Sequence, residues 1–157
     1  MQPTGYFSKA RNSVKCEVCP KGKYARDYTR TITRSDGSVS NISADDCDNC
    51  GRGQYGIVEG AESKNNCTAC AAGRFSSDEV ITNPNGCEFC DSGSYGTETG
   101  RIRKSQCELC DAGKYSENKG ATSEDDCIGC VQGKYSDQVA ASNSTDCKVC
   151  PIGYYQA

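Results

Sequence analysis

The chain has 157 residues, 14 of them cysteine and none histidine or tryptophan, and its formal net charge is -3 at pH 7. Leucine, isoleucine, valine and phenylalanine supply only 19 residues, about 12% of the chain, whereas chains below roughly 20% normally stay disordered. Burying so little apolar surface cannot offset the conformational entropy lost on folding. Covalent links or metal ions must supply the missing stability, and the cysteine content indicates a disulfide scaffold.

Several classes of function are excluded by the same composition. A chain without histidine has no Ser-His-Asp or Cys-His arrangement, and it also lacks glycine-rich phosphate loops, so we expect no enzyme and no cofactor. The 18 Lys and Arg against 21 Asp and Glu give no basic field for nucleic acid. No apolar run is long enough to span a membrane, and residues 1–15 lack the apolar stretch of a secretory signal.

The cysteines form seven C-x-x-C pairs, which recur every 20 residues from Cys47 onward. A glycine follows three residues after each pair, and an aromatic residue two positions further on. The resulting repeat, C-x-x-C-x-x-G-x-Y/F, predicts a tandem-repeat architecture. The glycines are Gly22, Gly53, Gly73, Gly93, Gly113, Gly133 and Gly153, and the aromatic residues are Tyr24, Tyr55, Phe75, Tyr95, Tyr115, Tyr135 and Tyr155.

Each position of the repeat has a physical interpretation. The glycine indicates a tight turn with positive φ or a close backbone approach. The aromatic residue is the one large apolar group of most repeats, so we expect it to pack over a neighbouring disulfide. Polar residues, a turn and the next cysteine follow, which predicts short irregular β-hairpins and no helix. The expected fold class is a small disulfide-rich protein with little core, extended as an elongated rod.

In chain order, we expect partial repeats at both ends and six complete repeats between them. The first complete repeat contains an insertion, residues 28–43, which alternates around Asp36-Gly37 and therefore predicts a projecting β-hairpin. The expected boundaries are 1–18, 19–49, 50–69, 70–89, 90–109, 110–129, 130–149 and 150–157.

Three disulfide patterns are compatible with the period. Each C-x-x-C pair could close on itself, pairs could combine in twos, or each second cysteine could join the first cysteine of the next pair. We favour the third pattern because it treats all repeats alike, and each loop of about 16 residues then contributes roughly 3 kcal/mol. It joins Cys19 to Cys47, Cys50 to Cys67, Cys70 to Cys87, Cys90 to Cys107, Cys110 to Cys127 and Cys130 to Cys147.

The segment CPKGKY, from Cys19 to Tyr24, resembles the cysteine-rich modules of tumour necrosis factor receptors. The strict repeat, as in CELCDAGKYS, is similar to the ephrin-receptor-like cysteine-rich repeats of extracellular proteins. This resemblance covers about Cys16 to Tyr155. It implies a secreted or cell-surface location, β-rich loops, an elongated rod and one loop-closing bridge per module. The chain lacks the six-cysteine modules of mixed spacing found in the receptors.

Other signals in the sequence are weaker. The C-x-x-C spacing also fits zinc, but four-cysteine sites would leave two of the 14 cysteines unused, so we expect no metal. The acidic groups Asp45-Asp46 and Glu124-Asp125-Asp126 lack the spacing of a calcium loop. The basic run of Arg101, Arg103 and Lys104 is read as a solvated face rather than a polysaccharide site. N-linked glycans are expected at three Asn-x-Ser/Thr sequons, Asn41, Asn66 and Asn143.

Two functions are compatible with these observations. In the first, the chain is a structural subunit of an extracellular fibre or surface appendage that assembles head to tail with copies of itself, through Cys150 of one copy and Cys16 of the next. In the second, it is a ligand-binding cysteine-rich ectodomain fragment of a receptor or adhesion protein. Near-uniform loops favour the first, and the inserted hairpin favours the second.

Overall fold

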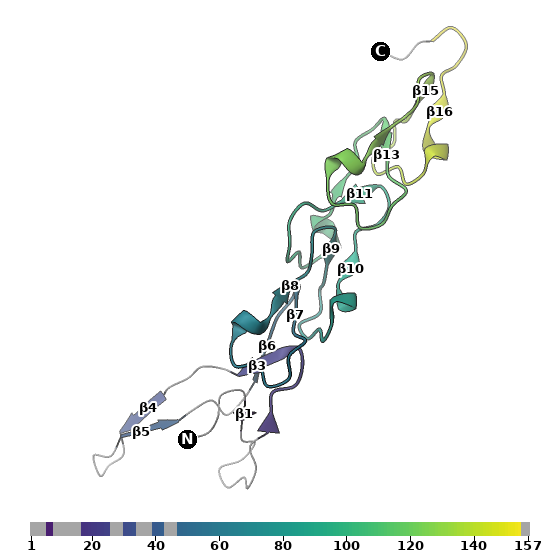
Figure 1. The fold of residues 1–157 in the computed structure, drawn as a ribbon. Helices are drawn as coiled ribbons and strands as arrows, with labels where there is room; N and C mark the ends of the chain where they lie inside the picture. Colours follow the sequence, from purple (N-terminus) through teal and green to yellow (C-terminus); the bar gives the residue numbers. More distant parts are fainter. Residues whose placement is uncertain (1–5, 8–16, 26–29, 34–38, 43–46, 155–157) are drawn as a thin grey trace. The chain divides into compact units, whose positions relative to one another are not determined.

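The computed structural model of the chain describes residues 6–7, 17–25, 30–33, 39–42 and 47–154. The chain divides into two compact units, residues 1–69 with 78–86 and residues 70–77 with 87–157. Within the described residues, the regular structure consists of two-stranded antiparallel hairpins and single turns of 3-10 helix, and Figure 1 labels many of the strands. The predicted fold class, a small disulfide-rich protein of tandem hairpins without α-helices, is confirmed.

In the first unit, the described residues form four pairs of strands. Strand β1 (Tyr6–Phe7) pairs with β2 (Glu17–Val18), β3 (Lys23–Ala25) with β6 (Cys47–Asn49), β4 (Arg30–Thr33) with β5 (Val39–Ile42), and β7 (Gln54–Tyr55) with β8 (Thr68–Ala69). The 3-10 turns are η1 (Lys64–Asn66) and η2 (Pro84–Gly86). The inserted segment thus forms the β4–β5 hairpin, in register from Arg30↔Ile42 to Thr33↔Val39. Its expected turn at Asp36-Gly37 lies outside the described residues.

The second unit repeats one hairpin design four times. Strand β9 (Arg74–Phe75) pairs with β10 (Glu88–Phe89), β11 (Ser94–Tyr95) with β12 (Glu108–Leu109), β13 (Lys114–Tyr115) with β14 (Ile128–Gly129), and β15 (Lys134–Tyr135) with β16 (Lys148–Val149). The 3-10 turns are η3 (Lys104–Gln106), η4 (Glu124–Asp126) and η5 (Ser144–Asp146). Each turn directly precedes the first cysteine of a pair. The repeat boundaries themselves stay a prediction.

Disulfides close each of these loops. The bonded pairs are Cys19–Cys47, Cys50–Cys67, Cys70–Cys87, Cys90–Cys107, Cys110–Cys127 and Cys130–Cys147. The first pair is separated by 28 residues and the other five by 17. The inserted hairpin therefore lengthens one loop without changing the pairing rule, which is the third of the three patterns considered above.

Cysteine sulfur and small side chains form most of the buried apolar groups. Phe75, only 6% exposed, packs with Cys90 and Cys107, the bridge of the following loop. The expectation that the repeat's aromatic residue packs over a neighbouring disulfide is confirmed at this position. The neighbouring Gly56 and Gly96 lie so close to the sulfur atoms of Cys50 and Cys90 that a Cβ would approach them within 3.0 and 3.3 Å.

The repeat glycine satisfies two requirements at once. All seven of these glycines have positive φ, between 71° and 87°. At Gly73, moreover, an added Cβ would lie 2.3 Å from the carbonyl oxygen of Gly120, and at Gly93 it would lie 2.2 Å from that of Ala140. The turn and the close backbone approach that the sequence indicates therefore occur together, and at Gly73 and Gly93 the approach involves a turn two repeats further along the chain.

Backbone hydrogen bonds join successive repeats within each unit. The N–H after the aromatic residue donates to a carbonyl 25 residues further on, as in Ser76 to Arg101, Gly96 to Ala121 and Ser116 to Ala141. Ala25 makes the equivalent bond to Ala61 across the longer loop. Several such bonds recur at each step, which favours the constant period from Cys47 onward, whereas the first loop makes the equivalent bond and places its extra residues in the inserted β4–β5 hairpin.

Side-chain oxygens hold the 3-10 turns. Asp126 Oδ2 accepts the N–H groups of Thr122 and Ser123, at 2.8 and 3.1 Å. Gln106 and Asp146 make the same pair of bonds in their own repeats, and Asn66 accepts the N–H of Ser63. The residue before the first cysteine thus closes the turn that leads into the disulfide.

In the repeat of residues 70–89, an apolar contact stands in place of these turn-closing hydrogen bonds. Ile81, 4% exposed, occupies the buried position that Ala61, Ala121 and Ala141 fill elsewhere. Gly86 stands where the turn-closing side chain would be, and a Cβ there would lie 2.3 Å from Ile81 Cγ2. The larger residue at one position is therefore accommodated by the loss of a side chain at the other.

We expect Ala140→Gly to stabilise the protein by about 1 kcal/mol. Ala140 has a φ of 59°, whereas Gly60, Gly100 and Gly120 occupy the equivalent turns with φ of 72°, 72° and 74°. Glycine removes the steric cost of the left-handed conformation, part of which is offset by its greater entropy when unfolded. Guanidinium denaturation with the disulfides intact measures the change. The control is the buried neighbour, because Ala141→Gly only deletes a packed methyl group and should destabilise the protein.

Candidate functional site

No cluster of three or more metal-binding side chains occurs among the residues that the structure describes. Within the same residues, no helix is long and apolar enough to cross a membrane. Of the acidic groups considered for calcium, Asp45-Asp46 lies outside the described residues, whereas the carboxylates of residues 124–126 serve the local turn and an ion pair. The exposed side chains of the described repeats are the next candidates for a functional site.

The basic run of the sequence does not form an open cationic patch. Arg101 is 6% exposed, and its Nη2 donates to Glu108 Oε1 at 3.0 Å and to Thr97 Oγ1 at 3.3 Å. Lys104 forms an ion pair with Asp91, and this hydrogen bond holds the pKa of Asp91 below its ordinary value. Two of the three basic side chains are thus neutralised within their own repeat, which agrees with a structural role.

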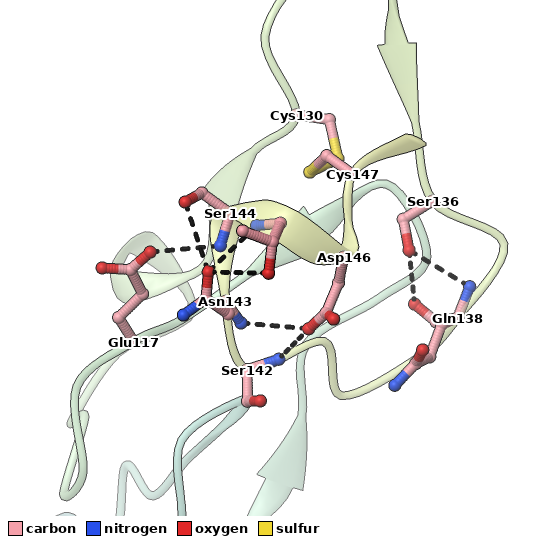
Figure 2. The surroundings of a disulfide bond; sticks show 10 residues. Glu117, Cys130, Ser136, Gln138, Ser142, Asn143, Ser144, Asp146 and Cys147 are labelled. Atoms are coloured by element: carbon pink, nitrogen blue, oxygen red, sulfur yellow. Dashed lines mark hydrogen bonds between the residues drawn. A yellow bond between two sulfur atoms is a disulfide. The ribbon is translucent and has the colours of Figure 1, made fainter. Parts of the chain in front are cut away.

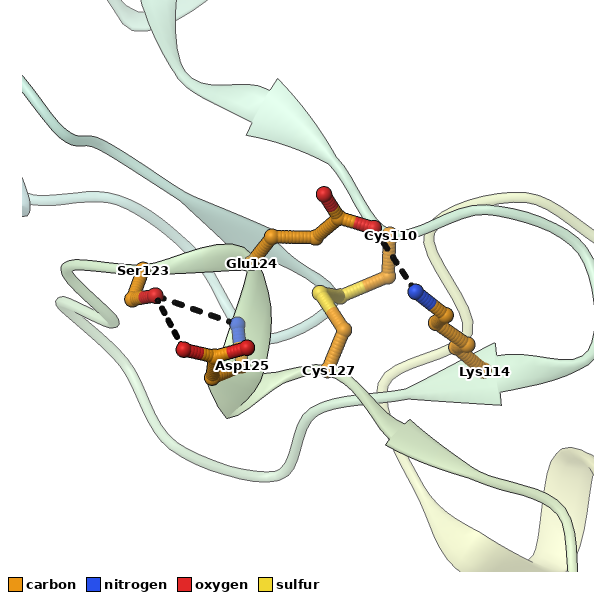
Figure 3. A network of polar contacts seen from close by, with 6 residues as sticks. All are labelled: Cys110, Lys114, Ser123, Glu124, Asp125 and Cys127. Atoms are coloured by element: carbon orange, nitrogen blue, oxygen red, sulfur yellow. Dashed lines mark hydrogen bonds and ion pairs between the residues drawn. A yellow bond between two sulfur atoms is a disulfide. The ribbon is translucent and has the colours of Figure 1, made fainter.

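Figure 3 shows the corresponding contacts around the disulfide Cys110–Cys127. Lys114 Nζ lies 2.7 Å from Glu124 Oε1, and this hydrogen bond lowers the pKa of Glu124 and raises the pKa of Lys114. Ser123 Oγ accepts the N–H of Asp125 and donates to its carboxylate. These acidic residues organise the loop rather than a ligand site.

The two terminal cysteines of the predicted head-to-tail contact differ in what the structure shows. Cys150 is a free, half-buried thiol, and its N–H donates to the carbonyl of Gly133. Cys16 lies outside the described residues. The structure therefore describes one of the two thiols, and the bridge between copies stays a prediction.

The three sequons lie in different local structures. Asn41 is in β5, paired with Thr31, and its side chain is outside the described part. Asn66 ends η1, directly before the bonded Cys67, and Asn143 precedes η5. Figure 2 shows the Asn143 side chain among the polar contacts beside the disulfide Cys130–Cys147.

Large apolar side chains lie exposed on the C-terminal repeats. Several of them lie within the C-x-x-C pairs or just after them, a position that the sequence does not single out. No spacing rule distinguishes them from core residues in the sequence, because burial depends on the stacking of repeats. Within residues 109–154, the exposed residues are Leu109, Ile128, Val131, Tyr135, Val139, Val149, Ile152 and Tyr154.

An exposed aromatic residue of the same unit is held rigidly. Phe89 is 48% exposed, and the guanidinium of Arg74 lies 3.8 Å from the centre of its ring. Arg74 also donates to the carbonyl of Cys87 at 3.4 Å. On the ring's edge, a Cβ on Gly120 would come within 2.4 Å of Phe89 Cδ1, so the ring is packed against this glycine. Phe89 thus presents apolar surface at little cost in side-chain entropy.

Exposed apolar groups are informative in this chain because apolar residues are so scarce. The fold buries sulfur, alanine and two larger side chains, Phe75 and Ile81, while most of its other large apolar side chains in the described residues face solvent. Exposed apolar side chains are a common component of protein contact sites. The surface of residues 109–154 is therefore the strongest candidate for a binding site.

The family model described as tyrosine-protein kinase ephrin type A/B receptor-like matches residues 5–67. The same C-x-x-C-x-x-G-x-Y/F pattern continues through the rest of the sequence. A comparison with curated proteins gives no significant match.

Proposed function

We propose that this chain, whose residues 5–67 match the ephrin receptor-like family model, is part of an extracellular receptor or adhesion ectodomain that binds another protein. The repeats supply a disulfide-stapled scaffold. The binding surface consists of the exposed apolar side chains of residues 109–154. This location suits the disulfides, which persist in oxidising compartments.

The exposed apolar side chains are the observation that carries this proposal. Ile128 lies within the pair Cys127/Cys130, Val131 directly follows it, and Val139 lies in the following loop. They are 53%, 61% and 55% exposed. About half of each of these side chains is left uncovered by the fold, and a contact with a partner would bury that remaining apolar surface.

A binding experiment with the full chain tests the proposal. The labelled chain is expected to bind saturably to the surface of the cells that produce it, and the combined variant Ile128→Ser, Val131→Ser and Val139→Ser should weaken binding by tenfold or more, about 1.4 kcal/mol. The matched control is Ile57→Ser with Val58→Ser, which replaces residues that are 55% and 42% exposed outside this surface. Equal binding by both variants would contradict the proposal.

The free thiol Cys150 favours a second candidate, a structural subunit of an extracellular fibre. In this alternative, Cys150 of one copy bonds to Cys16 of the next, and the heterologous contact extends into a filament. Non-reducing electrophoresis with peptide mapping should then give a ladder of multimers joined by this bridge, and electron microscopy should give ordered filaments. A monomer in which both thiols can be alkylated would sink this alternative.

A further inference from the structure

Two of the sequons differ in how the fold uses their asparagine. We propose that Asn143 carries an N-linked glycan, and that Asn66 is largely protected from modification because the disulfide Cys50–Cys67 closes over its sequon. This inference rests on the extracellular location in the proposed function, because the modification occurs in the secretory pathway.

Asn143 presents its amide nitrogen to solvent. Its Oδ1 accepts the N–H and the Oγ1 hydroxyl of Thr145, each at 3.0 Å, so the side chain is oriented through its oxygen (Figure 2). The residue is exposed, and the amide Nδ2 has no hydrogen-bond partner in the described part of the chain. The nitrogen that receives a sugar is therefore accessible, and the threonine of the same sequon lies beside it.

A glycan on Asn143 is compatible with every contact that holds this turn. In the transfer, Nδ2 forms a bond to the anomeric carbon of a glycosyl diphosphate donor, the bond from that carbon to the phosphate oxygen breaks, and one amide proton leaves with the diphosphate. The carbonyl oxygen is unchanged and still accepts from Thr145. The backbone bonds of the turn, from Asn143 N–H to Asp146 and from Ser144 N–H to Glu117, involve other atoms.

The Asn66 sequon is arranged differently. Its middle residue is Cys67, which is bonded to Cys50, and Thr68 begins strand β8, where it pairs with Tyr55. Asn66 accepts the N–H of Ser63 and so closes the turn before the disulfide. Once the loop has closed, all three residues of the sequon are fixed between a 3-10 turn and a strand.

Modification of Asn66 therefore competes with closure of its loop. An open chain can place Asn66, Cys67 and Thr68 in a transferase, whereas the closed loop can do so only by breaking strand pairing next to a disulfide. Because disulfides form over seconds to hours, the two reactions overlap in time. The residues of the Asn143 sequon precede Cys147 and include no cysteine, so closing Cys130–Cys147 withdraws none of them.

Site occupancy in the full chain, produced by secretory expression, tests this inference. Glycans are removed with an N-glycosidase in heavy-oxygen water, and mass spectrometry of peptides from the medium and from the cells reports each asparagine separately. Asn143 should be occupied in most molecules and Asn66 in a minority. Cys50→Ser should raise the occupancy of Asn66 roughly threefold or more, because its loop cannot close while the sequon stays intact.

Two further variants keep the test independent of general misfolding. Cys67→Ser also opens the loop and should raise the occupancy of Asn66, whereas Cys130→Ser opens a different loop and should leave it unchanged. Full occupancy of Asn66 in the unaltered chain, an unmodified Asn143, or no response to Cys50→Ser would overturn the inference. None of these results would change cell binding through Ile128 and Val131, so the proposed function is tested separately.

Discussion

Gly73→Ala should destabilise the second unit by about 3–5 kcal/mol, whereas Gly113→Ala at the same repeat position should cost only about 1–2 kcal/mol. Both glycines have positive φ, 74° and 84°, so both variants carry the steric cost of a left-handed residue. Only at Gly73 would the new Cβ lie 2.3 Å from a backbone carbonyl oxygen, that of Gly120. At Gly113 no atom lies within 4 Å of it.

The pair of variants therefore separates the free-energy cost of straining the local turn from the cost of disturbing the stacking of repeats. Guanidinium denaturation with intact disulfides, monitored by circular dichroism, measures the loss of stability in each variant. Because a backbone carbonyl cannot rotate away as a flexible side chain can, the added methyl group must displace a turn two repeats further on. Equal losses for the two variants would mean that the glycine serves only its own turn.

The sequence was sufficient to predict the repeat unit because the unit is defined by local chemistry. Glycine three residues after each second cysteine is required by a positive φ that other residues adopt at a cost. The inserted hairpin follows from its alternation, and strands β4 and β5 lie within the expected residues 28–43. Such features depend on neighbours in the chain, which the sequence displays directly.

The packing between repeats was not predictable in the same way. From Cys67 onward, the buried position six residues before each first cysteine is occupied by alanine, isoleucine or arginine in different repeats, so no apolar pattern reveals it. The sequence places Arg101 in a solvated basic run, whereas in the structure its side chain is buried and paired with Glu108. Ile81 is accommodated only because Gly86 lacks a side chain. These relations emerge only when successive repeats are placed against each other.

The acidic residues before the cysteines illustrate the same limit. The sequence places Asp126 in a solvated acidic cluster. In the structure its carboxylate closes the turn that leads into Cys127. A signal was present in the sequence: Asn66, Gln106, Asp126 and Asp146 all precede a first cysteine and all carry a side-chain oxygen. The common chemistry of the position, rather than its charge, indicates its function.

Removing the disulfide Cys90–Cys107 should have the largest effect of any change in one loop. The variant Cys90→Ala with Cys107→Ala loses roughly 3 kcal/mol of loop-closure free energy, and it also removes the sulfur atoms against which Phe75 packs. Alanine avoids burying an unpaired hydroxyl group. We therefore expect a total loss of about 4–6 kcal/mol and rapid proteolysis within residues 91–106.

A cysteine outside the bridges provides the control, and reductant or chelator treatment tests the unaltered protein. Cys150→Ala removes a free thiol and should leave the denaturation midpoint unchanged. Complete reduction should unfold the chain, because the loops lose their covalent closure and few aliphatic groups are buried to stabilise them. A chelator should have no effect on the oxidised protein. If the chelator unfolded the protein and the reductant left it folded, metal coordination rather than disulfide bonding would hold the repeats together.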